Sequence, residues 1–244
     1  MTSPSSSGSG MVAVRKYYPG KAPPSLPGFT TVLIHTSKDT LGGPLSPYHL
    51  KNEYGQFLEN IWQFSKIYTG VEARRNAKSR FQPLEIIWDH PGETHVNEGE
   101  PNEAYWAWRK KGMNNFYPVR WPNGFHGAKK CLCAIVTEKW LQDPENTDPC
   151  EPGPFVRLDY IEARKKIYCA EYARLTQDHP EFLKLKGMLR SGKSLLITEV
   201  DGPEPGVILS ETLVRFHLED KSRPFGDGMV IGSLLVGGEK WMQM

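Results

Sequence analysis

Runs of β-branched and aliphatic residues recur along the chain between glycine, proline and polar residues, and they predict strands. The clearest run is Thr30–His35, which indicates a buried strand. Another run lies at residues 195–200, and the turn residues Asp201-Gly202-Pro203 end it. We expect strands at residues 30–35, 84–89, 131–136 and 195–200.

Apolar residues at helical spacing fill longer segments and predict helices. Ile161, Tyr168 and Tyr172 share one stripe of the longest segment, and Asp159 is placed to cap its start. Asn102 has the same relation to the helix that follows it. We expect helices at residues 57–68, 104–111, 159–176, 180–190, 207–219 and 229–236.

Helices and strands are mixed along the chain without a regular strand-helix-strand period, which favours an α+β fold over a doubly wound sheet. Residues 1–10 are rich in Ser and Gly and have nothing to bury, so residues 1–20 are predicted to be a disordered or extended N-terminal segment. The 20 prolines and 23 glycines predict many loops. We therefore predict a single compact, loop-rich α+β domain over residues 21–244, with a mixed sheet packed with several helices.

Charge is nearly balanced, with 30 basic and 28 acidic residues, so the chain is not a bulk polycation. A local basic groove is still compatible with that balance. No apolar run approaches the roughly 18 residues of a membrane span, and residues 1–10 lack the order of a signal peptide. We expect a cytoplasmic protein with no membrane partner and four free cysteine thiols.

Residues 187–194 match the phosphate-binding pattern G-x-x-x-x-G-K-[ST]. That motif requires a strand before the loop and a helix after it, so that the loop amides converge on a phosphate. Here the predicted helix comes first and the predicted strand follows. We therefore interpret Gly192 as the end of a helix and residues 187–194 as a turn.

His90, Glu93 and His95 are residue types that zinc accepts, and they lie within six positions. A third distant ligand and a helical or hairpin spacing are not evident, so a polar surface or substrate-contact loop is favoured. We expect no metal and no redox cofactor.

A basic segment contains Arg74, Arg75, Lys78 and Arg80. Aromatic residues farther along are placed to interleave with basic residues, namely Tyr105, Trp106, Trp108, Tyr117 and Trp121. Such a surface would bind phosphates and stack bases, which makes a non-catalytic nucleic-acid-binding protein one functional hypothesis. The alternative interpretation is a solvated charged loop.

Glu59, Gln63 and Lys66 fall within about 60° of one another on the helix predicted at residues 57–68. Apolar and aromatic residues cover most of the remaining circumference. A helix packed on nearly all sides that keeps three polar groups in register suits the wall of a site. The alternative is an ordinary exposed stripe with a contact between Glu59 and Gln63.

Three segments resemble the NADAR-type N-glycosidase family. They are Leu45-Ser46-Pro47-Tyr48, then Glu59-Asn60-Ile61-Trp62-Gln63-Phe64-Ser65-Lys66, and the glycine-rich stretch Phe225-Gly226-Asp227-Gly228-Met229-Val230-Ile231-Gly232-Ser233-Leu234-Leu235. Their order agrees with the family. The chain departs from the family's Leu-Ser-Asn-Phe and Glu-His-x-x-Gln-x-x-Lys at Pro47 and Asn60.

The resemblance implies a small α+β protein that cleaves the N-glycosidic bond to ribose in an ADP-ribosylated nucleobase or a related nucleotide-derived molecule. Glu59 matches the family's catalytic carboxylate, and such a group stabilises the positive charge that develops on the sugar. The roles expected for the other residues are a second carboxylate from Asp227 or Asp220, stacking on a base by Tyr48 or Trp62, a hydrogen bond to a ribose hydroxyl or water by Gln63, a phosphate contact by Lys66, and substrate contacts by Phe225 and Gly226. The expected partner is a nucleotide or ADP-ribose-type small molecule.

Overall fold

The structure is a computed structural model that describes residues 9–35, 37–73, 88–124 and 127–243. The fold class is α+β, as predicted. The chain divides into two compact units, which are described separately. We call residues 1–49 and 172–244 the terminal unit, and residues 50–171 the central unit. The predicted strand at residues 84–89 lies mostly outside the described residues.

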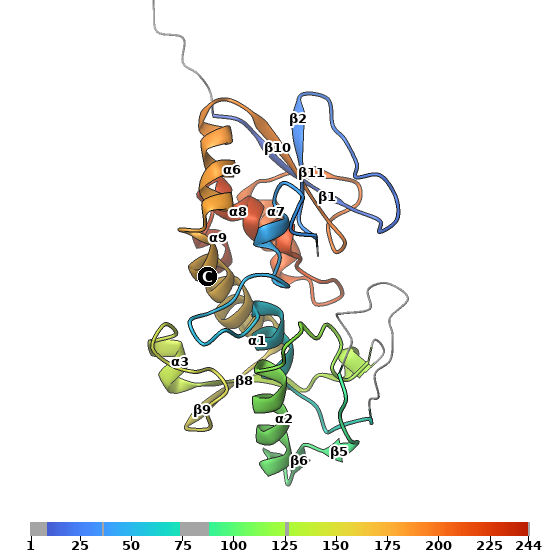
Figure 1. Cartoon of the computed structure of the whole chain (residues 1–244), viewed down its shortest axis with the longest axis vertical. Helices are drawn as coiled ribbons and strands as arrows, with labels where there is room; N and C mark the ends of the chain where they lie inside the picture. Colours follow the sequence, from blue (N-terminus) through green and yellow to red (C-terminus); the bar gives the residue numbers. More distant parts are fainter. Residues whose placement is uncertain (1–8, 36, 74–87, 125–126, 244) are drawn as a thin grey trace, which may run out of the picture. The chain divides into compact units, whose positions relative to one another are not determined.

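A four-stranded mixed sheet forms the centre of the terminal unit (Figure 1). Its strands are β1 (Val12–Lys16), β2 (Phe29–Leu33), β10 (Ser194–Glu199) and β11 (Val207–Ile208), in the order β11-β1-β10-β2. Strands β1 and β2 run parallel to β10, and β11 pairs antiparallel with β1. Residues 195–199 of β10 are all buried, as expected for a central strand covered on both faces.

Strand β1 corrects the predicted boundary of the fold. Val12, Ala13 and Val14 are buried, and β1 lies between β10 and β11 inside the sheet. The folded unit therefore begins before residue 21. The strand was not predicted from the sequence, because the apolar run around Val12-Ala13-Val14 is short and a basic, proline-rich stretch follows it.

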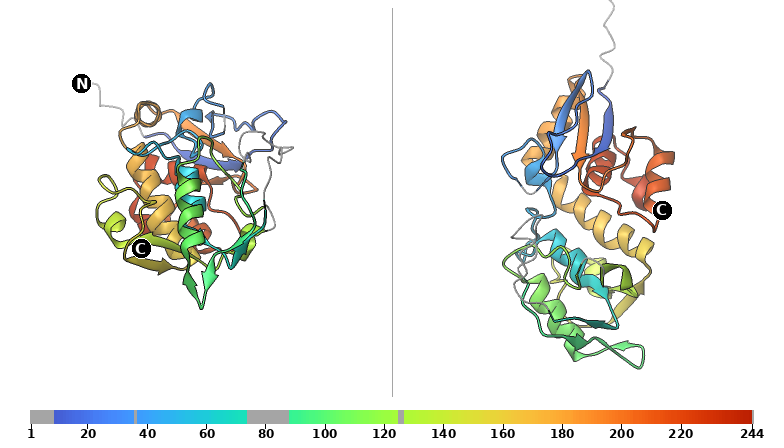
Figure 2. Two further views of the ribbon diagram at one scale, coloured as in Figure 1. Left: turned by 60° about the horizontal axis from the view of Figure 1, so that its bottom comes forward. Right: turned by 90° about the vertical axis from the view of Figure 1, so that its right-hand side faces the viewer.

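Within the described residues the terminal unit contains four whole α-helices, residues 172–176 of a fifth, α5, and a short 3₁₀ helix, η1. They are η1 (Gly43–Leu45), α5 (Ala170–Thr176), α6 (Pro180–Arg190), α7 (Glu211–Glu219), α8 (Asp227–Leu235) and α9 (Lys240–Gln243). Helices α6 and α8 pack against each other and against the sheet (Figure 2). The predicted helix at residues 207–219 is wrong at its start, because residues 207–208 pair with β1 and Ser210 caps a helix that begins at Glu211.

Residues 187–194 form the predicted turn. Helix α6 ends at Arg190, Gly192 has a positive φ of 85°, and the Lys193 N–H donates to the Met188 carbonyl. Strand β10 follows at once. A helix in front of the loop and a strand behind it is the reverse of a phosphate-binding loop.

A three-stranded antiparallel sheet and two two-stranded antiparallel sheets lie in the central unit. The sheet has the order β3-β8-β9 and consists of β3 (Lys66–Ile67), β8 (Cys133–Thr137) and β9 (Phe155–Leu158). One two-stranded sheet pairs β4 (Gly70–Val71) with β5 (Glu93–Thr94), and the other is the hairpin of β6 (Val96–Asn97) and β7 (Glu100–Pro101).

The helices of the central unit are α1 (Leu58–Ser65), α2 (Glu103–Met113), η2 (Gly127–Lys130), α3 (Glu138–Gln142) and α4 (Tyr160–Ala163). A π-helical segment, η3 (Arg164–Cys169), continues α4 and leads into α5, so the predicted helix at residues 159–176 is confirmed. Asp159 and Asn102 accept hydrogen bonds from backbone N–H groups at the starts of α4 and α2, as predicted.

Aromatic side chains form the core between α1 and α2. Phe64, Tyr68, Tyr105 and Trp108 are buried there. Gly112 allows the close approach of the two helices, because a Cβ at that position would overlap the Phe64 ring. None of the helices in the described ranges has the length and apolar character needed to cross a membrane.

Candidate functional site

Helix α1 and the residue that follows it carry a chain of three buried polar side chains. Gln63 Nε2 donates to Glu59 Oε1 at 2.9 Å, and Lys66 Nζ donates to Gln63 Oε1 at 3.0 Å. Glu59, Gln63 and Lys66 are only 6%, 8% and 6% exposed. The interpretation as an ordinary exposed stripe is therefore wrong, while the contact between Glu59 and Gln63 that it included is present.

The direction of the Gln63 amide follows from the chemistry of its two neighbours. A carboxylate only accepts hydrogen bonds and an ammonium only donates them. The amide nitrogen must therefore face Glu59 and the amide oxygen must face Lys66. Gln63 links a buried negative group to a buried positive group, which offsets part of the cost of removing both from water.

An aromatic cluster lies beside this chain. Lys66 Nζ is 4.3 Å from the centre of the Trp62 ring. The Trp62 ring centre is 5.9 Å from that of Tyr160 and 5.5 Å from that of Tyr168. Trp62 thus packs against two tyrosines in this structure, and its predicted stacking on a base stays a prediction.

Arg164 and Tyr160 join this region, and neither was predicted as a site residue. Arg164 is buried at the start of the π-helical segment, with its guanidinium carbon 4.9 Å from the Tyr160 ring centre. Short π-helical segments inside α-helices often occur at functional sites. The predicted helix accounts for the position of both residues, but a single sequence contains no signal for the π-helical turn.

Asn60 occupies the position where the family has histidine, and it has a structural role here. Its side chain donates to the Tyr117 carbonyl at 3.1 Å and accepts from the Val119 N–H at 2.7 Å. Asn60 therefore fixes the loop that follows α2.

A second group of predicted site residues lies in the terminal unit, at the start of α8. Phe225 and Gly226 are buried, and Asp227 is half-buried as the first residue of the helix. The carboxyl group of Glu199 reaches this turn, where Glu199 Oε1 accepts from the Met229 N–H at 3.2 Å. A Cβ at Gly226 would overlap Glu199 Oε2, so this close approach requires glycine.

Glu199 was missed by the sequence reasoning, because it is the next-to-last residue of the strand predicted at residues 195–200 and is consistent with a polar end of that strand. Burial and the charges of Asp227 and Asp201 raise the pKa of Glu199 well above its ordinary value. The N–H groups of Gly228 and Met229 act in the opposite direction. A buried carboxyl with a strongly shifted pKa beside a second acid is a candidate functional group.

Tyr48 is also in the terminal unit, within the turn that follows η1. It is half-buried, and its backbone N–H is 3.4 Å from the Ser46 hydroxyl oxygen. Ser46 is buried, and the Leu45 carbonyl accepts a hydrogen bond from the Tyr172 hydroxyl. The Leu-Ser segment therefore forms the predicted turn.

The structure brings Glu59, Trp62, Gln63 and Lys66 together in the central unit. In the terminal unit it brings Phe225, Gly226 and Asp227 to the buried Glu199. Tyr48 lies in the same unit as this second group.

Two of the five aromatic residues of the nucleic-acid hypothesis are buried. Tyr105 and Trp108 are buried in the core of the central unit, so they are not available for stacking. Trp106, Tyr117 and Trp121 are half-buried. The four basic residues of that hypothesis, Arg74, Arg75, Lys78 and Arg80, lie outside the described residues, and their role stays a prediction.

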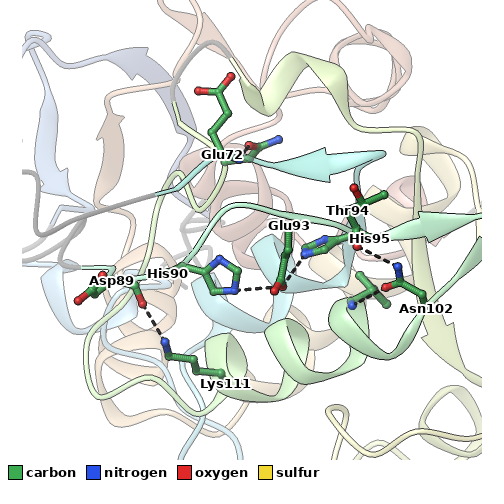
Figure 3. Close-up of polar contacts among 10 residues, drawn as sticks. Glu72, Asp89, His90, Glu93, Thr94, His95, Asn102 and Lys111 are labelled. Atoms are coloured by element: carbon green, nitrogen blue, oxygen red, sulfur yellow. Dashed lines mark hydrogen bonds and ion pairs between the residues drawn. The ribbon is translucent and has the colours of Figure 1, made fainter.

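His90, Glu93 and His95 form a compact cluster in the central unit (Figure 3). Both imidazoles point toward Glu93, with His90 Nε2 at 3.2 Å and His95 Nε2 at 3.0 Å from Glu93 Oε1. Both rings are buried, and that of His90 stacks on Trp88 with ring centres 5.5 Å apart. The predicted polar surface is therefore wrong at these two residues, and the alternative of a substrate-contact loop stays a prediction.

Burial lowers the pKa of both imidazoles below the usual 6.5, although the Glu93 carboxylate acts in the opposite direction. Across residues 9–35, 37–73, 88–124 and 127–243, no three His, Cys, Asp or Glu side chains are arranged to hold a metal ion. The cluster is best described as neutral imidazoles packed into an aromatic core.

Comparison of the chain with protein-family models, with curated proteins and with solved structures found no match. The resemblance to the NADAR-type family stays a prediction.

Proposed function

We propose that the protein is an N-glycosidase-like hydrolase that cleaves the bond between ribose and a nitrogen of an ADP-ribosylated nucleobase or nucleotide-derived substrate. The observation that supports it is the buried, hydrogen-bonded chain of Glu59, Gln63 and Lys66 on α1 and at its end. Burying a carboxyl group and an ammonium group costs free energy, and an ordinary packing helix has no need of either. We expect the protein to act in the cytoplasm.

In this proposal Glu59 stabilises the positive charge that develops on the ribose ring. The bond between the anomeric carbon and the base nitrogen breaks, and its electron pair leaves with the nitrogen. Water adds to the anomeric carbon and its proton is transferred to Glu59, which passes a proton on to the departing base. The low-dielectric surroundings of α1 strengthen the attraction between a carboxylate and such a cation.

Gln63 and Lys66 have supporting roles in this reaction. The Gln63 amide holds one oxygen of Glu59, which fixes the direction of the carboxyl group. The Lys66 ammonium supplies a positive charge for a substrate phosphate. Its position over the Trp62 ring limits the directions in which the ammonium can reach a phosphate.

The test is turnover of ADP-ribosylated nucleosides and DNA, followed by chromatographic detection of the released base. Glu59→Gln keeps the shape of the side chain but removes its charge, and we expect the rate to fall roughly 10²- to 10⁴-fold, the usual contribution of an acid–base group. Glu138→Gln is the matched control, since Glu138 is an exposed residue of the same unit. Equal turnover by wild type and Glu59→Gln would remove the assigned role.

A further inference from the structure

The loop that joins β1 to β2 in the terminal unit contains a proline-rich segment, residues 21–27 (Figure 1). Its sequence is Lys21-Ala22-Pro23-Pro24-Ser25-Leu26-Pro27. The segment belongs to no helix or strand, and it leads into β2, the outermost strand of its sheet. Lys21, Pro23 and Pro27 are exposed, while Pro24 and Leu26 are half-buried. The function proposed above uses none of these residues.

The covalent structure of this segment favours the polyproline II conformation. The ring of each proline fixes its φ at about −65°. The residue before a proline is pushed toward the extended region, and this applies to Ala22, Pro23 and Leu26. Five of the seven residues are therefore restricted in this way. Because the conformation exists before any partner arrives, binding costs little conformational entropy.

Hydrogen bonds hold the second half of the segment against β2. The Thr31 hydroxyl, on β2, donates to the Pro24 carbonyl at 3.2 Å. The Phe29 N–H donates to the Leu26 carbonyl at 3.0 Å, and Gly28 between them has a φ of 80°. A turn with proline followed by glycine at its centre has this form, so the extended segment ends at a defined point.

The first half of the segment begins at a positively charged end. The ammonium groups of Lys16 and Lys21 each lie 5.5 Å from the centre of the Tyr18 ring. The Tyr18 hydroxyl donates to the carboxylate of Glu204, so one acid faces two lysines. The Lys21 N–H donates to the Tyr18 carbonyl at 3.0 Å, which fixes the chain at this end.

The spacing of the charge and the prolines matches the repeat of a polyproline II helix. With roughly three residues per turn, Lys21, Pro24 and Pro27 follow one edge of the helix. Pro23 and Leu26 follow the neighbouring edge. Domains of the SH3 type bind such P-x-x-P segments in grooves lined by aromatic side chains. A lysine on the same edge as the two prolines requires acidic residues beside that groove.

The P-x-x-P pattern occurs at two other places in the sequence, and neither can dock in this way. These are Pro44–Pro47 and Pro149–Pro152. Pro47 and Pro149 are buried, so one proline of each pair cannot reach a groove. The residues three positions before these pairs are leucine and asparagine, whereas the first pattern has Lys21 there.

We propose that residues 21–27 are a docking segment for a protein domain of the SH3 type, with acidic residues beside its aromatic groove. The prolines and Leu26 fill the aromatic-lined groove, and Lys21 pairs with the acidic residues. The proposal goes beyond the hydrolase function and is independent of it.

The test is NMR titration of nitrogen-15-labelled SH3 domains with the full, unlabelled chain. The probes are SH3 domains that bind basic, proline-rich peptides, each paired with a variant whose acidic residues are changed to amides. We expect shifts in the aromatic groove of at least one domain. Pro24→Ala and Pro27→Ala should each weaken this binding roughly tenfold or more, as for an anchor residue of an interface.

Lys21→Ala should also weaken the binding, and the remaining affinity should depend less on salt. The amide variant of the same SH3 domain should bind wild type and Lys21→Ala equally, because the charge partner is then missing. Since Lys21 is exposed, this pair of measurements tests the segment even where a proline substitution disturbs folding. Pro152→Ala is the matched control, because Pro152 is the exposed proline of another P-x-x-P pattern, and it should retain the wild-type affinity.

The proposal would be overturned by an absence of shifts in every domain, or by shifts that lie outside the aromatic groove. Equal affinities of wild type, Pro24→Ala and Pro27→Ala would also overturn it, and so would equal affinities of wild type and Lys21→Ala for an SH3 domain that keeps its acidic residues. Turnover plays no part in these measurements, so a failure of the hydrolase proposal is a separate result.

Discussion

At the scale of single residues, Gln63 explains how α1 tolerates two charged side chains in a buried position. Its amide accepts from Lys66 and donates to Glu59, so one neutral side chain serves both. The helical period of the sequence was enough to place the three residues on one stripe. It could not show that the stripe is buried, because burial depends on segments far from α1 in the chain.

Gln63→Leu should lower the free energy of unfolding by about 3–6 kcal/mol, because it removes two hydrogen bonds to charged groups, which contribute roughly 1.5–3 kcal/mol each. The side chain keeps a similar volume, so the change reports mainly the lost hydrogen bonds. Urea unfolding measures the effect. Gln177→Leu is the control, since Gln177 is exposed. An equal effect of the two substitutions would show that the Gln63 hydrogen bonds contribute nothing measurable.

The buried imidazoles of His90 and His95 should make stability depend on pH. Their pKa values are lower in the folded protein than the ordinary 6.5, so the unfolded chain binds more protons as the pH falls through 6.5. Stability should therefore be highest above that pH and decrease below it, by at most about tenfold in the unfolding constant per pH unit for each proton. Unfolding curves between pH 5 and 8 measure this slope.

His95→Gln should make that slope shallower, because one of the two protonation sites is removed while a polar side chain remains near Glu93. The comparison is between slopes rather than absolute stabilities, since the substitution also changes packing. Identical slopes for His95→Gln and wild type would show that His95 is not the group responsible.

At the scale of helices and strands, apolar periodicity and capping residues predicted most elements, and long-range pairing decided where they end. Helix α1 ends at Ser65 because Lys66 and Ile67 pair with β8. Residues 207–208 leave the predicted helix for the same reason, since they pair with β1. Strand partners far away in the sequence leave no local pattern. The contact between the Glu199 carboxyl group and the start of α8 was missed for the same reason, because the two segments are far apart in the sequence.

Two glycines in helices give opposite predictions. Gly112→Ala should destabilise the protein by about 1–3 kcal/mol, because its Cβ would overlap the Phe64 ring in a packed core. Gly187→Ala should stabilise it by about 0.5–1 kcal/mol, because nothing lies within 4 Å of a Cβ there and alanine is the better helix former. Thermal or urea unfolding of the two variants measures both. A stabilising or neutral effect of Gly112→Ala would contradict the close approach of α1 and α2, and a destabilising effect of Gly187→Ala would contradict the open space at Gly187.

At the scale of the whole molecule, the α+β class was predictable because helical and strand patterns alternate irregularly. The division into a terminal and a central unit was not, because the terminal unit combines residues from both parts of the chain. Val12, Ala13 and Val14 show why. They belong to an apolar run of only four residues, Met11–Val14, and only the pairing of β1 with β10 reveals their place in the sheet.

The strand order of the terminal unit has a consequence for how the chain acquires its structure on the ribosome. Strands β1 and β2 do not pair with each other, and β10 lies between them. The sheet therefore closes only after Ser194–Glu199 has been synthesised, whereas all strands of the central unit are made before that point. During translation β1 and β2 therefore remain unpaired until β10 has been made, and the central unit, which lies between β2 and β10 in the sequence, can fold first.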